Sequence, residues 1–487
     1  MSKEEYRSSN GAISSPGSFS ITTAAVSVST RSLPYQLHRW FVILLFSIGN
    51  IVNLAAQIAD EPQGGLQPRF QTQAVTYEAV ALFGEDTSKA VVNIHYRLWQ
   101  NFFIFIRNDA ESRTSEYRAR GELLIELLDE ERNSVARQIK QISMAQTTLP
   151  KESEVLPDIQ GAMTFTVPKG TYQVVFSLDD RESGRSFLER TRRITARRPN
   201  LTAMELSPPL LLQPNAHPDE QAFTPINRGG DVLFGGRGSI VSQMYLGSED
   251  EVLDVQWKLE GQLDGFKGRT QTFSGSMYAM VEGLLSLAGN QEGIQYRVQS
   301  SPLAWRTVSL PIPFEKLEPG LFKLDVEYTA GGKTQTQTHG FRVTWPQRPY
   351  SLFNATLALE ALRHIASDEE MDGLLSSSGL RQAEAFSLFW RQKDPDTTTA
   401  YNEVLTEYYL RVDEALRRFS GVREGDGFKT DRGRIYILYG PPSQTNRVFQ
   451  PGGPPTEIWI YSQIKRRFVF IDPNKSGAYI LSKAENL

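Results

Sequence analysis

The stretch DGFKTDRGRIYILYGPP, residues 426–442, separates two different patterns in the C-terminal third of the chain. Before it, apolar residues recur with helical spacing from Leu405 to Phe419, which predicts an amphipathic helix. The following pattern is strand-like, with apolar side chains on both faces of three short runs, residues 434–439, 457–461 and 467–471. The sequence therefore predicts a small α+β domain over residues 350–487.

Helical signals also occupy the start of this domain. Residues 358–365 carry an apolar face, and Ser367 to Glu370 has the form of a capping box that begins the next helix. Residues 381–391 carry three aromatic side chains before Asp394 and Pro395 end the pattern. We expect a helical segment that covers part of the small sheet.

The region before this domain alternates apolar and polar residues, as half-buried strands do. Val92, Ile94 and Tyr96 alternate with Asn93 and His95, and the same alternation returns around Trp257. The sequence predicts two antiparallel β-sandwiches of immunoglobulin-like type, residues 70–198 and 199–346.

A weak internal repeat supports two related units. A Pro/Gly turn leads into an alternating strand after Pro168 and again after Pro319. Each strand then meets a glycine turn, at Ser183-Gly184 or at Gly331-Gly332, before a return strand. Antiparallel sandwiches are commonly closed by such hairpins.

Composition limits the classes of function. The 487 residues contain 52 Lys and Arg against 56 Asp and Glu, a formal charge of −4, so no global field favours nucleic acid. The chain has no cysteine, which excludes disulfides, a thiolate nucleophile and cysteine metal sites. The five histidines are scattered singly, and His95 and His364 are predicted on the surface or rim of a strand and a helix. No metal or cofactor is predicted.

Residues 1–56 are expected to form a polar prefix followed by a signal peptide. His38 and Arg39 precede an apolar run that ends in small residues, and cleavage after Ala56 fits this layout. Export would place the chain in the periplasm or cell envelope of a bacterium. The alternative is an uncleaved membrane anchor over residues 40–59, which would also leave the rest of the chain outside the cytoplasm.

The C-terminal motifs resemble the GWxTD domain family over about residues 350–485. The family's name-giving tryptophan position is Phe428 here, which keeps a flat apolar ring and loses the indole N–H. The resemblance implies an exported bacterial protein with a β-rich N-terminal region and an undefined biochemical role. The motif residues, expected to be structural or partner-binding, are Gly427, Phe428, Thr430, Asp431, Arg432, Gly433, Gly440, Pro441, Pro442 and Trp459.

Two readings of Asp431 remain open. In the favoured one it lies in a turn, where it caps backbone N–H groups, Gly427 and Gly433 supply permissive φ angles, and the neighbouring arginines hold the carboxylate. In the other it belongs to a recognition or acid–base site. A carboxylate pair for glycoside hydrolysis would have to come from Asp426, Asp431, Glu457 and Asp472, but no spacing in the sequence selects two of them.

Seven arginines between Arg181 and Arg198 are expected to protect a solvated strand edge and linker. The alternative for them is a patch that binds phosphate-bearing lipid or acidic polysaccharide.

The expected function is that of a non-catalytic exported envelope protein. Its β-sandwiches would serve as spacers or binding faces, and its C-terminal domain would dock an envelope protein or a cell-wall glycan. The alternatives are an extracytoplasmic hydrolase acting on a glycan and an external sensor anchored through residues 40–59. Nucleic acid is not an expected partner.

Overall fold

The computed structural model describes residues 74–108, 116–150, 156–214, 222–226, 228–247, 252–265, 268–290, 293–420 and 426–487. The expected signal peptide, the segment 40–59 and the cleavage site after Ala56 lie outside these residues. The chain divides into two units, Met1–Leu66 and Gln67–Leu487, and every described element belongs to the second. None of the helices in the described ranges is long and apolar enough to cross a membrane.

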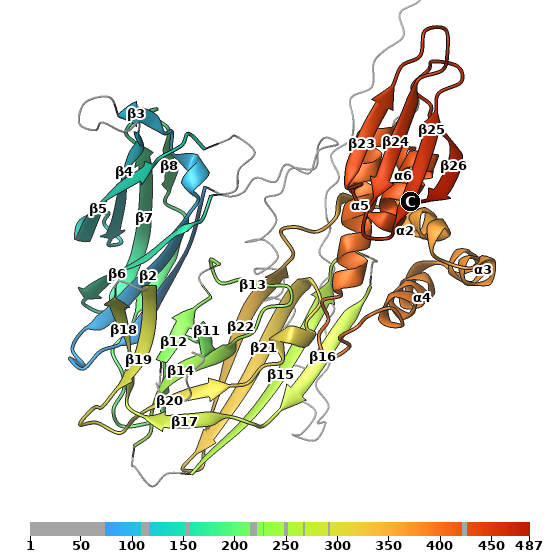
Figure 1. The fold of residues 1–487 in the computed structure, drawn as a ribbon. Helices are drawn as coiled ribbons and strands as arrows, with labels where there is room; N and C mark the ends of the chain where they lie inside the picture. Colours follow the sequence, from blue (N-terminus) through green and yellow to red (C-terminus); the bar gives the residue numbers. More distant parts are fainter. Residues whose placement is uncertain are drawn as a thin grey trace, which may run out of the picture. The chain divides into compact units, whose positions relative to one another are not determined.

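The first β region consists of two antiparallel sheets (Figure 1). One is formed by β1 (Val75–Phe83), β2 (Ala90–Leu98) and β6 (Ile159–Val167). The other is formed by β3 (Ile106–Asn108), β4 (Glu116–Leu128), β5 (Ser134–Gln146), β7 (Gly170–Asp180), β8 (Ser186–Glu189) and β9 (Arg193–Ala196). A short 3-10 helix, η1 (Gln100–Phe102), follows β2. Side chains from both sheets, including Ile94, Leu123 and Phe176, form one apolar core.

The second β region also has two sheets around one core. The larger contains β10 (Glu205–Leu206), β11 (Leu210–Pro214), β12 (Ala222–Pro225), β14 (Ser239–Tyr245), β17 (Ala279–Glu282), β18 (Leu284–Asn290), β19 (Gly293–Gln299) and β20 (Trp305–Leu310). The smaller contains β13 (Val232–Leu233), β15 (Leu253–Leu263), β16 (Thr270–Gly275), β21 (Gly320–Ala330) and β22 (Lys333–Thr344). The short 3-10 helix η2 (Phe314–Lys316) precedes β21. Met244, Leu259 and Leu324 lie in the shared core.

The two predicted hairpins are present, and they differ. β21 pairs with β22 along its whole length, and the turn between them has Gly331 at φ 55° and Gly332 at φ 72°. Two successive left-handed residues give the primed turn that matches strand twist, which explains the glycine pair. The strand that returns along β7 is instead split into β8 and β9.

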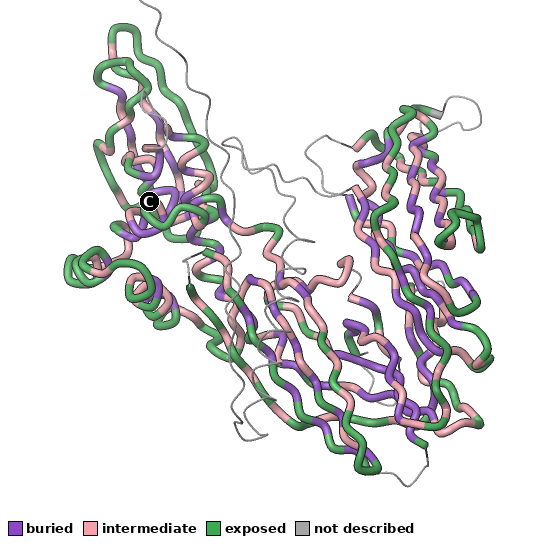
Figure 2. Tube along the Cα trace, turned by 180° about the vertical axis from the view of Figure 1, so that it is seen from behind, coloured by how far each residue is buried: buried purple, intermediate pink, exposed green. Residues whose placement is uncertain are grey.

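The prediction that β2 is half-buried is wrong. Asn93 and His95 are buried as fully as the apolar residues between them, and His95 Nε2 lies 2.6 Å from the Tyr296 hydroxyl of β19. Val80 and Leu82 of β1 pack in the same place against the larger sheet of the second region, and the burial can be followed along the chain in Figure 2. Strands β1 and β2 are therefore covered on both faces here, whereas β6 keeps Gln160, Thr164 and Thr166 exposed. His95 is an interior residue.

The C-terminal region is α+β, as predicted. Its helical elements are η3 (Tyr350–Phe353), α2 (Ala355–Ala361), η4 (Leu362–His364), α3 (Asp368–Ser376), α4 (Gly379–Arg391), α5 (Glu403–Phe419), η5 (Gly427–Lys429) and α6 (Asp431–Tyr439). Its antiparallel sheet has the order β23 (Gln444–Val448), β24 (Thr456–Tyr461), β25 (Arg466–Ile471) and β26 (Ile480–Asn486). The predicted capping box is confirmed, since Ser367 and Glu370 bond reciprocally at the start of α3.

The strand predicted over residues 434–439 is wrong, because these residues form most of helix α6. Thr430 caps this helix, and Ile435, Tyr436 and Ile437 are all buried. A helix that is apolar around most of its circumference shows no amphipathic period, so the pattern resembles a strand covered on both faces. Its end is typical of a helix, with Gly440 at φ 75° followed by two prolines.

Candidate functional site

Thr430 organises the start of the motif. Its Oγ1 accepts a hydrogen bond from the Gly433 N–H at 3.0 Å and donates one to the Gly427 carbonyl at 2.8 Å. The first bond satisfies an N–H group at the start of α6, and the second closes the 3-10 turn η5. Thr430, and not Asp431, is therefore the helix cap.

Gly427 and Gly433 are required by close backbone contacts and not by their φ angles. Neither residue has a φ in the left-handed region. A Cβ at Gly433 would lie 2.0 Å from the carbonyl oxygen of Gly427, and a Cβ at Gly427 would lie 2.3 Å from that of Ala415. Helices α5 and α6 approach each other across this turn, and any larger residue would force the backbones apart. The prediction of permissive φ angles is wrong for both.

Phe428 takes the place of the family's tryptophan as a core residue. It is 1% exposed and belongs to the core that α2, α5, α6 and the sheet share. Its carbonyl oxygen lies 2.8 Å from Nε2 of His364, the half-buried last residue of η4. Burial lowers the pKa of His364 below its ordinary value, and the bond to the Phe428 carbonyl partly opposes this. The contacts of Phe428 are those of a packing residue.

Asp431 joins the start of α6 to the last strand. Its Oδ2 accepts the backbone N–H of Leu481 at 2.7 Å, and its Oδ1 lies 3.4 Å from Arg434. A carboxylate in the first turn of a helix is also favoured by the helix dipole. Of the two arginines predicted to hold Asp431, only Arg434 does so.

Arg432 points instead to a buried acceptor, Glu457. Its Nη1 lies 3.3 Å from Glu457 Oε2, and its Nη2 donates to the Gly477 carbonyl at 3.1 Å. The guanidinium centre also lies 4.2 Å from the centre of the Tyr479 ring. Burial lowers the pKa of Arg432, and the charge of Glu457 acts in the opposite direction. The pair links the start of α6 to the sheet.

Trp459 lies two residues after Glu457 on the same face of β24 and completes this network. Its indole Nε1 donates to Glu457 Oε1 at 2.7 Å, and its ring packs on Phe419 of α5 and Phe470 of β25. Glu457, only 4% exposed, therefore has a donor on each of its two oxygens. A buried carboxylate needs such partners to stay charged without a large desolvation cost.

Gly440, Pro441 and Pro442 carry the chain from α6 to β23. The Gly440 carbonyl accepts a hydrogen bond from the Tyr461 hydroxyl at 2.9 Å, and a Cβ at Gly440 would lie 3.3 Å from the Arg411 guanidinium. The prolines cannot continue the helix, since they lack the N–H that its hydrogen bonds use. These residues end one element and position the next.

The other two candidate carboxylates also have local partners. Asp472 accepts the backbone N–H groups of Ser476 and Gly477, at 3.1 and 2.6 Å, and so holds the turn between β25 and β26. Asp426 lies 3.3 Å from the Lys429 ammonium group. Among the described residues, no group of three or more His, Asp or Glu side chains is placed to hold a metal ion.

Residues 328–485 match the GWxTD domain family. The chain carries a GWxTD domain. The match begins in β21 and includes β22, so it reaches further toward the N-terminus than the motifs suggested. All ten predicted motif residues lie inside it. Seven of them lie at or beside the start of α6, and Gly440, Pro441 and Pro442 lie at its other end.

Comparison with curated proteins gave no match. Among solved structures, red sea bream transglutaminase is similar at 9% sequence identity and a TM-score of 0.16, over 55% of this chain and 31% of that one. The chain thus spans less than a third of the transglutaminase, and the likeness is too low to inform on function.

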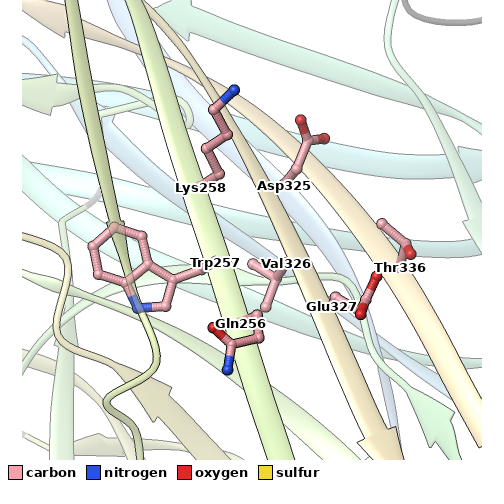
Figure 3. Close-up of a pocket in the computed structure, with 7 residues that line it drawn as sticks. All are labelled: Gln256, Trp257, Lys258, Asp325, Val326, Glu327 and Thr336. Carbon is pink, nitrogen blue, oxygen red and sulfur yellow. The ribbon is translucent and has the colours of Figure 1, made fainter. Parts of the chain in front are cut away.

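Two depressions on the surface of the described residues are lined by none of the ten motif residues. One, of about 270 Å³, is on the polar face of the smaller sheet of the second region (Figure 3). There Lys258 of β15 lies directly opposite Asp325 of β21. Another, of about 280 Å³, is lined by Arg197, Glu205 and Gln337 among others. In the first depression Glu327 of β21 lies opposite Thr336 of β22, and no sequence motif pointed to either depression.

The arginine-rich stretch lies at the β7 side of the first region, where β8 and β9 each pair with β7 over a few residues. Four of its seven arginines have partners within the chain. Arg181 bonds Glu122, Arg185 the Phe102 carbonyl, Arg192 the Tyr77 carbonyl and Arg197 Glu205. These bonds favour the structural interpretation over an anion-binding patch.

Proposed function

We propose that this protein is a non-catalytic exported component of a bacterial cell envelope, whose GWxTD domain docks a protein or a cell-wall glycan. In this proposal the two β regions are immunoglobulin-like sandwiches, residues 70–198 and 199–346, that act as spacers or binding faces. The observation that carries the proposal is the use of the motif's polar groups. Asp431 bonds the backbone of β26, and Glu457 bonds Trp459 and Arg432, so both serve the domain's own framework.

The geometry of these carboxylates argues against general acid–base chemistry. A general acid or base must face the proton that it transfers within hydrogen-bond reach. Both oxygens of Glu457 instead face donors from the chain, and its side chain is 6% exposed. Packing and hydrogen bonding also account for Phe428 and Thr430, which leaves no motif residue that requires a substrate to explain it.

Export is supported by the signal-like residues 38–56, and it has a direct test. We expect the mature protein to begin at Gln57, after cleavage behind Ala56, and to occupy the periplasm or cell envelope. N-terminal sequencing of the protein from cells decides between this start and an intact segment 40–59. An intact segment would favour a membrane-anchored sensor.

Turnover assays test the non-catalytic part of the proposal. The purified protein should not hydrolyse cell-wall glycan, ester or peptide substrates, and Asp431→Asn should change only its stability. Turnover that is lost in Asp431→Asn or Glu457→Gln, with the fold intact by circular dichroism, would overturn the proposal in favour of a hydrolase.

A further inference from the structure

The GWxTD sheet ends at an unpaired strand, β23. It pairs with β24 on one side, and no other strand of the described residues pairs with it. All five of its residues, Gln444 to Val448, are exposed. The opposite edge strand, β26, is less regular, because its pairing shifts register between Val469 and Phe470. Free N–H and C=O groups along a regular edge are a template for an added strand, whereas a bulge discourages addition.

The face of this sheet that points away from α5 and α6 carries a cluster of aliphatic side chains centred on β24 and β25, while β23 adds Gln444, Asn446 and Val448 to it. Trp459 and Phe468 face the helical core, so alternation along β24 and β25 turns their neighbours outward. Six branched aliphatic side chains share the outer face, namely Val448, Ile458, Ile460, Val469, Ile471 and Ile480. The outer face of a sheet with one packed face is ordinarily polar. Phe449, 72% exposed, extends the apolar surface beyond the end of β23.

The helical side of the same edge carries an excess of positive charge. Arg447 of β23 is 66% exposed and must share the Glu457 carboxylate with Arg432, at 3.7 and 3.3 Å. Residues 426–487 contain nine Lys or Arg and five Asp or Glu, a formal charge of +4 within a chain of −4. Two cations facing one carboxylate leave Arg447 able to attract a negative group at this side of the edge.

We propose, building on the docking function above, that β23 binds an extended segment of a partner protein in which apolar and acidic side chains alternate. Successive side chains of a strand point to opposite faces of its sheet. An added strand would place its apolar residues on the outer face beside Val448, at the margin of the aliphatic cluster, and its acidic residues on the helical face beside Arg447. Backbone pairing supplies affinity, and the two faces select the partner.

Two synthetic peptides test this directly. The probe is a capped heptapeptide of alternating valine and glutamate, and its counterpart has lysine in place of glutamate. Fluorescence anisotropy with the purified full chain at low salt should show the glutamate peptide binding at least about tenfold more tightly. The preference should shrink as salt is raised. Arg447→Glu should abolish it, while Lys483→Glu, the same change of charge on the opposite edge strand, should retain it.

A pair of proline variants tests the pairing itself. Neighbouring N–H groups along a strand point in opposite directions, so one of Thr445→Pro and Asn446→Pro removes an outward N–H and the other removes a bond to β24. The variant that removes the outward group should keep a near-normal unfolding midpoint and lose peptide binding. If the variant with the unchanged midpoint binds the peptide as wild type does, strand addition is wrong.

Other outcomes separate this inference from the docking function. Equal affinity for both peptides, or no binding of either, would overturn strand addition, as would a chain that self-associates through β23 and excludes the peptide. If an envelope partner still crosslinks to the GWxTD domain in those cases, the docking function stands. If the partner is lost as well, both fail.

Discussion

The indole N–H of Trp459 and the carboxylate of Glu457, two residues apart on β24, form a buried hydrogen bond of 2.7 Å. Glu457 in turn holds Arg432, the residue that follows Asp431 in the motif. The name-giving aromatic position tolerates phenylalanine, whereas Trp459 uses its N–H. In this chain an indole N–H is therefore used for hydrogen bonding at Trp459, and not at Phe428, the position for which the family is named.

Trp459→Phe should lower the free energy of unfolding by about 1–3 kcal/mol beyond its loss of packing, since Glu457 would keep a buried oxygen without a donor. Trp305→Phe is the matched control, because the indole N–H of Trp305 is buried without a hydrogen-bond partner. Urea unfolding of both variants measures the difference. Equal losses would show that the bond contributes nothing to stability.

Gly433→Ala should be strongly destabilising, by about 3 kcal/mol or more, because the added methyl group meets a backbone carbonyl that has no room to move. Gly373→Ala is the control, since a Cβ there meets nothing within 4 Å and the residue lies inside helix α3. That change should stabilise the protein by about 0.5–1 kcal/mol. Thermal and urea unfolding would contradict the account if the two variants behaved alike.

Thr430→Val removes the helix cap and keeps the side-chain volume. It should cost about 1 kcal/mol of unfolding free energy, in the range of other lost caps. Thr430→Ser retains the hydroxyl and should cost less. A Thr430→Ser variant as unstable as Thr430→Val would mean that the hydroxyl does not cap α6.

The free energy of unfolding should depend on pH through Glu78 and Asp231, two carboxyl groups buried where the two β regions meet. Burial raises the pKa of Glu78 from 4.5 to about 7 and that of Asp231 from 3.8 to about 6. Both groups hold their protons more tightly in the folded chain. Their contribution to the free energy of unfolding is therefore lost as the pH rises through about 4 to 7, by up to about 1.4 kcal/mol per pH unit for each proton.

His95 acts in the opposite direction, because burial lowers its pKa from 6.5 to about 4. Its contribution is lost as the pH falls below about 6.5, when the unfolded chain takes up the proton.

The variant Glu78→Gln tests the contribution of Glu78. Urea unfolding between about pH 4 and 7 should show that this variant loses less stability than wild type as the pH rises. Parallel pH profiles would contradict the assignment to Glu78.

Local signals in the sequence predicted the elements that local physics decides. The sequence predicted the helix that ends at Phe419, the capping box at Ser367 and the strands around Trp459. Each of these depends on residues that are only a few positions apart. Helix α6 was not, because its apolar run lacks an amphipathic period.

The errors come from contacts that exist only in the folded chain. His95 is buried by Tyr296, and Arg432 bonds Glu457 rather than its neighbour Asp431. Likewise, the need for Gly433 arises from the Gly427 carbonyl, which only the folded turn brings near. The motif residues themselves could be named from the sequence, but their roles required the three-dimensional arrangement.

Photo-crosslinking in intact cells tests the central proposal, that the GWxTD domain docks a partner in a bacterial envelope. Because Phe428 is buried, the photoreactive residue belongs at Phe449, with Met277, equally exposed at 73%, as the control outside this domain. We predict a discrete adduct with another envelope protein or a cell-wall glycan from Phe449 and not from Met277, identified by mass spectrometry. No adduct at Phe449, or the same adducts from both positions, would contradict the docking function.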